Sequence, residues 1–327
     1  MRRLVSILLA GLMAVSLAAC GTNTTNTDST ASSNEKKEYT VGICQLVQHE
    51  ALDAATKGFK DALTEAMGDS VKFDEQNASN DSNACATIVN GFVSKNVDLI
   101  LANATPALQA AAAGTTQIPI LGTSVTEYGV ALELKDFNGV VGGNISGTSD
   151  LAPLDKQAEM LMELFPDAKK VGLIYCSSEA NSLYQVKVVK EYLESKGIEC
   201  KEFSFSDSND IAAVTTSACD YSDVIYVPTD NTVAYSTGII DGICRPAKVP
   251  VVAGEEGICK GCGVATLSIS YYELGRKTGM MAAKILKDGE DISKMEIEYD
   301  DNYKKKYNKE ICDALGIQVP EGYEAID

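Results

Sequence analysis

The sequence predicts an α/β protein built from two similar halves, each a parallel β-sheet with helices on both faces. Short β-branched, apolar segments alternate with amphipathic segments, a pattern typical of parallel sheets covered by helices. Three strand-like segments also recur in the same order along the 327 residues. The matched pairs are 41–43 with 171–173, 98–102 with 223–227, and 118–122 with 249–253.

The stretch after the strand at 223–227 indicates where function lies. Pro228 ends that strand. A polar turn that opens a helix follows it: Thr229, Asp230, Asn231 and Thr232. Ligands of parallel α/β sheets bind at the carboxyl ends of the strands. Strand 98–102 is also followed by polar residues, so we predict a ligand-binding cleft between the two halves.

The first half is predicted to contain strands at 39–46, 71–74, 98–102, 118–122 and 140–143. A helix is predicted from Leu52 to Met67, where apolar residues recur at three- and four-residue spacing. Further helices are expected from Ser82 or Asn83 and from Pro106, which suits the first turn of a helix. A crossover near 145–150 then leads to the second half.

The second half is predicted to alternate helices at 154–165, 182–196, 210–218 and 232–243 with strands at 171–176, 198–205, 223–227 and 249–253. The last part of the chain looks like a return to the first half. It is predicted to contain strands at 264–269 and 295–299, and helices at 271–286 and 308–315. Repeated crossing gives a multi-strand hinge, for which closure around a ligand is the expected motion. We therefore assign 39–146 plus about 270–298 to lobe 1, and 147–269 plus about 299–327 to lobe 2.

Composition limits the functional classes. The formal net charge is −18 and the pI about 4.5, which argues against a nucleic-acid partner because such proteins need a basic face. There is one histidine, His49, and no G-x-S-x-G, G-x-G-x-x-G or P-loop sequence. Nothing in the sequence brings a nucleophile beside His49, so we predict no catalytic residue, no cofactor and no enzymatic activity.

The N-terminus predicts export and a lipid anchor. Arg2 and Arg3 precede an apolar stretch over 4–17, which is short for a permanent membrane span. Leu17-Ala18-Ala19-Cys20 then matches a bacterial lipobox, in which Cys20 would be lipidated. An ordinary cleaved signal peptide is the alternative. Residues 21–38 form a predicted flexible linker, and the expected location is the extracytoplasmic face of the cell membrane.

Nine cysteines remain beyond Cys20. An odd number cannot pair completely within one chain, and several lie in apolar patterns, where cysteine behaves as a small hydrophobe. Cys259 and Cys262 have C-x-x-C spacing, but no second such pair or nearby histidine supports zinc binding, and no metal site is predicted. A local disulfide and two reduced loop cysteines both remain open.

The candidate ligand contacts in the first half follow its strands. Gln45 and His49 lie where the first helix begins, a position that attracts anions, although helix initiation alone could explain them. Two further strands are followed by Asn103, Thr105, Thr123, Ser124 and Thr126. Their amides and hydroxyls can hold an α-carboxylate. Turn formation alone could also explain them, because turns favour the same residue types.

The candidate contacts in the second half include acidic groups. Ser178 and Asn181 follow the first strand of this half. Asp230 and Asn231 follow the strand at 223–227 and are expected to lie opposite them. Asp230 is predicted to pair with a ligand ammonium because a buried ammonium needs an opposite charge. Glu255 competes for that role, although a solvated turn would also explain it.

Several stretches together carry a family resemblance: Val41-Gly42-Ile43-Cys44-Gln45, His49 to Asp53, Ala102 to Leu108, Tyr175 to Ser182, Pro228 to Thr232, and Thr266 to Gly279. Over residues 40 to 320 the chain resembles the ABC-transporter substrate-binding lipoproteins of the TrpX-like, aromatic amino-acid-binding group. The resemblance implies the type I periplasmic-binding fold, with two Rossmann-like lobes joined by three crossovers. It also implies capture of a small amino acid-like solute for an ABC permease and its ATPase.

The chain departs from that pattern at two places. Cys259 and Cys262 stand in a segment expected to be rich in glycine and aliphatic residues, and Glu50 replaces an expected proline. The ligand therefore stays open, with branched-chain amino acids second and a sugar or nucleoside third. A sensor that presents ligand to a receptor and an extracytoplasmic hydrolase are the alternative functions.

Overall fold

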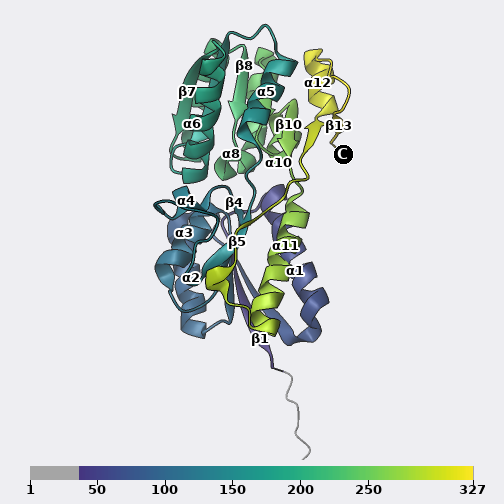
Figure 1. Cartoon of the computed structure of the whole chain (residues 1–327). Coiled ribbons are helices and arrows are strands. Elements are labelled where there is room, and N and C mark those ends of the chain that lie inside the picture. The colour runs from purple at the N-terminus through teal and green to yellow at the C-terminus, as the bar shows by residue number, and fades with distance from the viewer. Residues whose placement is uncertain (1–36, 327) are drawn as a thin grey trace, which may run out of the picture. The chain divides into compact units, whose positions relative to one another are not determined.

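Two separate β-sheets form the frame of the protein in the computed structural model, which describes residues 37–326 (Figure 1). The sheet of lobe 1 contains β1 (Tyr39–Gln45), β2 (Val71–Asn77), β3 (Leu99–Asn103), β4 (Ile120–Val125), β5 (Ile145–Ser149) and β11 (Glu298–Tyr299). The sheet of lobe 2 contains β6 (Lys170–Cys176), β7 (Glu199–Phe205), β8 (Val224–Val227), β9 (Val251–Ala253), β10 (Ala265–Ser268), β12 (Lys304–Tyr307) and β13 (Glu324–Ala325).

Both lobes repeat one topology. The parallel strands follow the order β2-β1-β3-β4-β5 in lobe 1 and β7-β6-β8-β9-β10 in lobe 2. The three segment pairs matched in the sequence are β1 with β6, β3 with β8, and β4 with β9, so the predicted repeat is confirmed. The sequence did not predict β12, which pairs antiparallel to β10, or the short β13 beside it.

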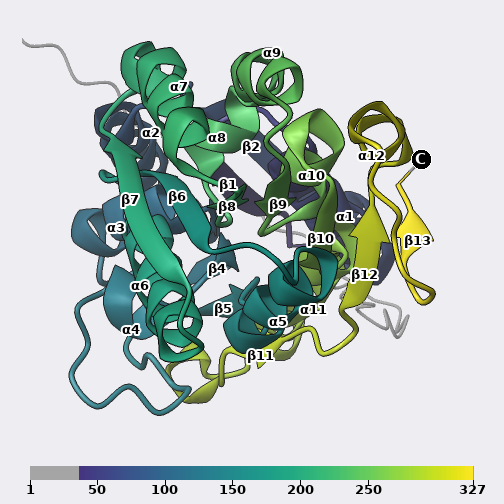
Figure 2. The same cartoon turned by 90° about the horizontal axis from the view of Figure 1, so that it is seen from above.

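Helices cover both faces of each sheet (Figure 2). In lobe 1, α1 (Glu50–Met67) and α11 (Tyr271–Ala283) cover one face, and α2 (Ser82–Lys95) and α3 (Thr105–Gly114) cover the other. In lobe 2, α5 (Leu154–Leu164), α6 (Ala180–Ser195) and α12 (Lys309–Leu315) lie opposite α7 (Ile211–Tyr221), α9 (Thr237–Ala247) and α10 (Glu256–Cys262). Short helices α4 (Tyr128–Ala131) and α8 (Asn231–Tyr235) follow β4 and β8.

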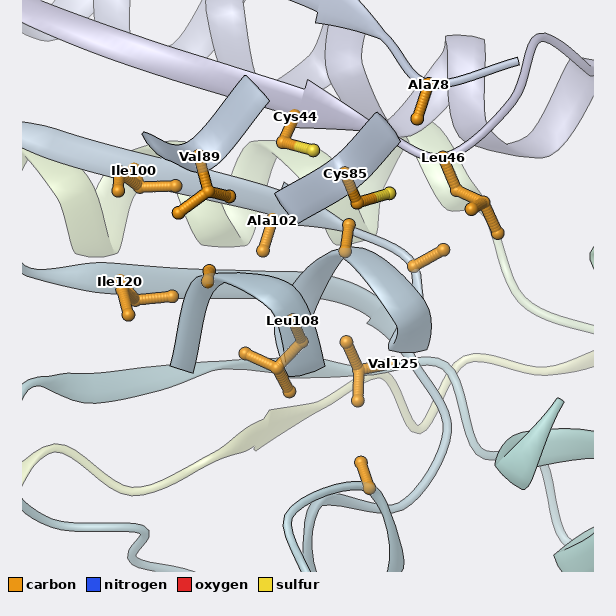
Figure 3. Close-up of a cluster of buried hydrophobic side chains, with 14 of the residues drawn as sticks. Cys44, Leu46, Ala78, Cys85, Val89, Ile100, Ala102, Leu108, Ile120 and Val125 are labelled. Carbon is orange, nitrogen blue, oxygen red and sulfur yellow. The ribbon is translucent and has the colours of Figure 1, made fainter. Parts of the chain in front are cut away.

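Buried cysteines belong to these cores. In lobe 1, Cys44 of β1 and Cys85 of α2 lie side by side among aliphatic side chains (Figure 3). All nine cysteines within residues 37–326 are free, and seven of them are buried. Cys259 and Cys262 are among the buried ones, and they lie on α10 rather than in the predicted loop. Glu255 caps that helix, which explains why this glycine-rich stretch is helical.

Helices α1 and α11 approach each other closely because glycines face the contact. A Cβ on Gly58 would lie 2.0 Å from the carbonyl oxygen of Tyr272. A Cβ on Gly275 would lie 2.0 Å from the carbonyl oxygen of Ala55. The late helix α11 is thereby packed into lobe 1 beside the first helix of the chain.

Three short connections cross between the sheets, at 150–153, 269–270 and 300–303. The first differs from its prediction, because the strand expected at 140–143 is wrong and β5 lies at Ile145–Ser149. Gly142 and Gly143 have φ angles of 81° and 61°, which turn the chain before β5 begins. The predicted helix at 232–243 is also divided at Ser236 into α8 and α9.

The predicted signal peptide, Cys20 and nearly all of the linker lie outside the described residues. Within residues 37–326, none of the helices combines the length and hydropathy needed to cross a bilayer.

Candidate ligand-binding site

The carboxyl ends of the parallel strands in both lobes border a narrow cavity. The free space inside it is only about 10 Å³, room for a single water molecule, whereas small-molecule sites in proteins usually enclose roughly 300–1,000 Å³. A larger ligand therefore fits only after the lobes move apart. Its lining residues are His49, Leu52, Ser124, Thr126, Asp150, Asn181, Thr229, Asp230, Asn231, Ala234, Glu255 and Tyr271.

Three buried polar atoms on this lining have no hydrogen-bond partner among the described residues. They are Ser124 Oγ, Asp150 Oδ1 and Asn181 Oδ1. Buried polar atoms in native proteins are nearly always hydrogen-bonded, because desolvation without compensation costs roughly 1–3 kcal/mol. Their convergence on one cavity therefore indicates a site that accepts a polar ligand.

The backbone on the lobe 1 side of the cleft is strained. Ser124 has a φ of 53°, and the register between β4 and β5 shifts around it. Ala104, which follows β3, has a φ of 92°. Residues other than glycine rarely adopt such angles, at a cost of roughly 1–3 kcal/mol each, and they concentrate at ligand sites.

Asp150 is the buried carboxylate with a free oxygen in this cavity. Its Oδ2 accepts a hydrogen bond of 2.9 Å from the Tyr271 hydroxyl, while Oδ1 has no partner. Burial raises the pKa of Asp150, because a charged carboxylate is poorly solvated there, and the hydroxyls of Tyr271 and Thr126 oppose that rise. A ligand ammonium at Oδ1 would relieve that penalty.

Asp230 also lines the cavity, but its carboxylate is occupied within lobe 2. Oδ1 accepts from the backbone N–H of Val233 at 2.9 Å, which caps α8. Oδ2 accepts from the N–H of Cys176 and the hydroxyl of Ser182, both at 2.7 Å. Burial, together with a smaller contribution from the nearby charge of Glu179, raises the pKa of Asp230 to about 7.

Glu255 is likewise a helix cap. Its carboxylate accepts from the backbone N–H groups of Gly257 and Ile258 at the start of α10. Burial raises the pKa of Glu255 to about 7, with a smaller contribution from Glu50 and Glu256. Both predicted acidic contacts of lobe 2 therefore border the cavity while holding their own helices.

His49 joins the lobes beside the cavity. Its Nε2 lies 3.3 Å from Oδ1 of Asn231, across the cleft. Burial lowers the pKa of His49, although Asn231 and Glu179 oppose that shift. The neutral imidazole is thus favoured, and its N–H can donate to the Asn231 oxygen.

The family is established by sequence comparison. A model for the family described as ABC transporter substrate binding protein matches residues 40–325. The chain belongs to this family. The tyrosine-binding protein of Clostridioides difficile (strain R20291) is 37% identical over 327 aligned residues, covering 97% of this chain and 93% of that protein.

Solved structures agree with the family and the fold. The crystal structure of an ABC domain from Streptococcus pneumoniae in complex with L-Trp is 32% identical, with a TM-score of 0.84. That match covers 89% of this chain and 100% of the other. The predicted type I periplasmic-binding fold, with two Rossmann-like lobes, is confirmed for this substrate-binding protein.

The arrangement of the lobes differs from that of an open relative. A ligand-free, open substrate-binding protein with adhesive properties from Clostridium difficile is 40% identical, yet its TM-score is 0.68. That match covers 88% of this chain and 99% of the other. The lobes of the present substrate-binding protein therefore follow the L-Trp complex more closely than the open structure.

Seven of the predicted contacts line the cavity: His49, Ser124, Thr126, Asn181, Asp230, Asn231 and Glu255. Ser178 instead borders an outer opening of the cleft, where its hydroxyl donates to the carbonyl of Ser206 at 3.2 Å. The other four lie outside the cavity lining: Gln45, Asn103, Thr105 and Thr123.

Those four residues are buried inside lobe 1. Asn103 Nδ2 donates to Thr56 Oγ1 at 2.9 Å, and Thr56 donates to Gln45 Oε1 at 2.6 Å. This chain of hydrogen bonds ties β1 and β3 to α1. Thr123 belongs to a cluster of buried threonine hydroxyls, and Thr105 Oγ1 is buried without a partner.

Sequence reasoning selected Thr126 but neither Asp150 nor Tyr271, all three of which line the cavity. It also did not select Glu179, which hydrogen-bonds to the lining residues Asn181 and Asn231. Asp150 directly follows β5, so it would have been selected had that strand been predicted at 145–149. Tyr271 begins α11 immediately after the second connection, and no pattern in the sequence marks it as a cavity residue.

A wider cavity of about 350 Å³ adjoins the site and shares Glu255 and Tyr271 with it. It is open to solvent, and the pair formed by Lys306 and Glu256, 2.6 Å apart, lies on its wall. The narrow cavity is the better candidate because the unpartnered buried atoms Ser124 Oγ, Asp150 Oδ1 and Asn181 Oδ1 gather there. Within residues 37–326, no group of three histidine, cysteine or acidic side chains could hold a metal ion.

Proposed function

We propose that this substrate-binding protein captures an aromatic amino acid between its lobes and delivers it to an ABC permease without catalysing a reaction. The family membership supports the transport role. The relatives that bind tyrosine and L-Trp support the choice of an aromatic side chain.

The free oxygen of Asp150 is the observation that carries the proposal. Three carboxylates border the cavity, and neither lysine nor arginine is among its lining residues. Asp230 and Glu255 are occupied as helix caps, which leaves Asp150 Oδ1 to accept from the α-ammonium. We therefore assign to Asp150 the role that the sequence suggested for Asp230.

The rest of an amino acid has matching groups around it. The hydroxyls of Ser124 and Thr126 can donate to the α-carboxylate from the strained end of β4. Leu52, Ala234 and the ring of Tyr271 offer apolar surface to the side chain. Capture requires the lobes to separate first, because the cavity is enclosed by both of them.

The location is part of the same proposal. Arg2, Arg3 and the lipobox ending at Cys20 support export and lipid anchoring on the extracytoplasmic face of the membrane. The wild type is expected to incorporate labelled fatty acid, and the Cys20→Ala variant is expected to incorporate none. Equal labelling of the two proteins would contradict the anchor at Cys20.

A thermal-shift panel on residues 37–327, unfolded and refolded to remove bound ligand, tests the function. The panel contains the twenty amino acids together with common sugars and nucleosides. A ligand at about 100 times its Kd adds about 2.7 kcal/mol to the free energy of unfolding, which raises Tm by a few degrees. Tyrosine, tryptophan or phenylalanine is expected to give the largest rise. A rise only with a sugar or nucleoside would overturn the proposed ligand class.

A further inference from the structure

Two hydrogen bonds between side chains join the lobes beside the cavity. One connects Nε2 of His49 to Oδ1 of Asn231 over 3.3 Å. The other runs from Nδ2 of Asn80 to Oγ1 of Thr232 over 3.1 Å. We call Asn231 and Thr232 the bridging residues, because both belong to lobe 2 and contact lobe 1. They are adjacent residues at the start of α8.

One buried carboxylate holds both bridging residues. Glu179 precedes α6 and is 4% exposed, but its side chain does not cap that helix. Its Oε1 accepts from the N–H of Thr232 at 2.9 Å and from the Thr232 hydroxyl at 2.8 Å. Its Oε2 accepts from the N–H of Asn231 at 3.0 Å and from Asn231 Nδ2 at 2.7 Å.

These contacts fix which atoms of the bridging residues point toward lobe 1. Because Thr232 gives its only hydroxyl proton to Glu179, its oxygen is left to accept from Asn80. Because Asn231 gives its amide group to Glu179, its Oδ1 is left to accept from His49. A group that accepts at every contact is required here, and an ionised carboxylate is such a group.

The same carboxylate also orients a residue of the cavity. Asn181 Nδ2 donates to Glu179 Oε2 at 3.1 Å and to the carbonyl oxygen of Thr229 at 3.0 Å. The amide oxygen of Asn181 is therefore the atom that remains without a partner. Glu179 thus connects a candidate ligand contact to the two hydrogen bonds made by the bridging residues, although Glu179 itself is absent from the cavity lining.

We propose that Glu179 is a positioning residue that retains the ligand by keeping the bridging residues in the orientation that joins the lobes. This inference rests on the proposed function, since retention is measured with a bound amino acid. Loss of Glu179 acts mainly on ligand release, because the hydrogen bonds between the lobes form only after closure. The initial encounter with the open protein does not involve them.

The test replaces Glu179 with glutamine in the full-length chain purified in detergent, and measures binding by stopped flow with the amino acid that stabilises the wild type. The glutamine amide would place a donor opposite groups that themselves donate. The dissociation rate constant is expected to rise roughly tenfold or more, with the association rate constant within about twofold of wild type. Equal rate constants for dissociation in Glu179→Gln and wild type would overturn the proposal.

Asp223→Asn is the matched control in lobe 2. Its carboxylate also accepts from two backbone N–H groups, those of Lys169 and Lys170, at 2.8 and 2.9 Å. It lies at the opposite end of the parallel strands, before β8 begins. This variant is expected to leave both rate constants unchanged. A similar acceleration of dissociation in Asp223→Asn would mean that any weakened lobe 2 releases ligand, which would contradict a specific role for Glu179.

Asn80→Gly keeps the test decisive if Glu179→Gln fails to fold. Asn80 has a φ of 65°, which glycine adopts without strain, and the change leaves lobe 2 untouched. It is expected to accelerate dissociation as well. In the double variant its effect should be much smaller, because Glu179→Gln already disorients Thr232. Full additivity of the two changes would contradict the proposal.

Amide hydrogen exchange of the ligand-free protein tests the role of Glu179 independently of the proposed function. Amides in the segment 78–81 are expected to exchange faster in Glu179→Gln than in wild type, because fewer molecules are closed. A protein that binds none of the tested compounds would overturn the proposed function, while the exchange result would still decide the role of Glu179. Unchanged exchange in the segment 78–81 would contradict the role of Glu179.

Discussion

The two lobes repeat one topology but prepare their strand ends differently. In lobe 2, the carboxylates of Glu179, Asp230 and Glu255 are all occupied by N–H and O–H groups of the same lobe. On the lobe 1 side, Ser124 Oγ and Asp150 Oδ1 are buried without partners. A shared fold therefore does not imply shared chemistry at equivalent positions.

The backbone conformation at the strand ends also differs between the two lobes. Lobe 1 has positive φ angles at Ala104 and Ser124, directly at its strand ends. The corresponding turns of lobe 2 contain helix caps and no positive φ outside glycine. Lobe 1 therefore combines backbone strain with two unpartnered atoms at the cavity. Lobe 2 has its carboxylates occupied as described above, and Asn181 Oδ1 is its one atom on the cavity lining that is buried without a partner among the described residues.

The largest expected effect comes from replacing, one at a time, the two aspartates that border the cavity. Asp150→Asn should weaken amino-acid binding by about 100-fold, near 3 kcal/mol, since it removes the charge opposite the ammonium. Asp230→Asn should weaken it less, because both oxygens of Asp230 are occupied within lobe 2 and neither is left for the ammonium. Isothermal titration calorimetry on both variants measures the difference. A larger loss of affinity in Asp230→Asn would show that the ligand ammonium binds to Asp230 of lobe 2 instead.

The packing of α11 gives the second-largest expected effect. Gly275→Ala should lower the free energy of unfolding of the protein by about 1–3 kcal/mol, because its Cβ would collide with the backbone of α1. Gly238→Ala, in α9 of lobe 2, is the control, since a Cβ there meets nothing within 4 Å. That change should be neutral or stabilising by about 0.4–1 kcal/mol. Urea denaturation distinguishes them, and equal destabilisation would rule out the close helix contact.

The pH dependence of stability should also distinguish the lobes. Asp230 and Glu255 have pKa values raised to about 7 from ordinary values of 3.8 and 4.5. Because the folded state then binds their protons more tightly, their contribution is complete below about pH 4 and is lost as the pH rises to about 7. Each group contributes at most about 1.4 kcal/mol per pH unit in that window.

His49 acts in the opposite direction, because its lowered pKa favours the folded state above about pH 6.5 and that contribution is lost on acidification. The measurement is therefore a difference between variants. Between about pH 5 and about pH 8, the free energy of unfolding of Asp230→Asn should change less than that of the wild type. Parallel curves for the two proteins would show that Asp230 does not titrate in this range.

The fold was largely predictable because its signals are local and repeated. Apolar strands such as 98–102 and 223–227, bounded by polar turns, identified the parallel core and its internal repeat. The prediction failed where the backbone departs from regular alternation. Gly142 and Gly143 gave the appearance of a strand end but form a turn, and β12 is a charged strand without an apolar signal.

The site was only partly predictable. Position after a strand correctly brought Asp230 and Ser124 to the cavity, since this follows from topology. Whether an oxygen is free or occupied depends on three-dimensional partners, such as Ser182 for Asp230, that the sequence does not place. For the same reason, Glu179 could not be distinguished from an ordinary residue of a polar turn.

The late position of α11 in the chain has a consequence for biosynthesis. Lobe 1 begins with β1 and α1, but the helix that covers the Phe59 side of α1 spans residues 271–283. The side of α1 that contacts α11, around Ala55 and Gly58, therefore has no native cover while residues 68–270 are being synthesised. Lobe 1 can be completed only after most of lobe 2 has been translated, so a nascent chain arrested before Tyr271 should expose a surface that molecular chaperones bind.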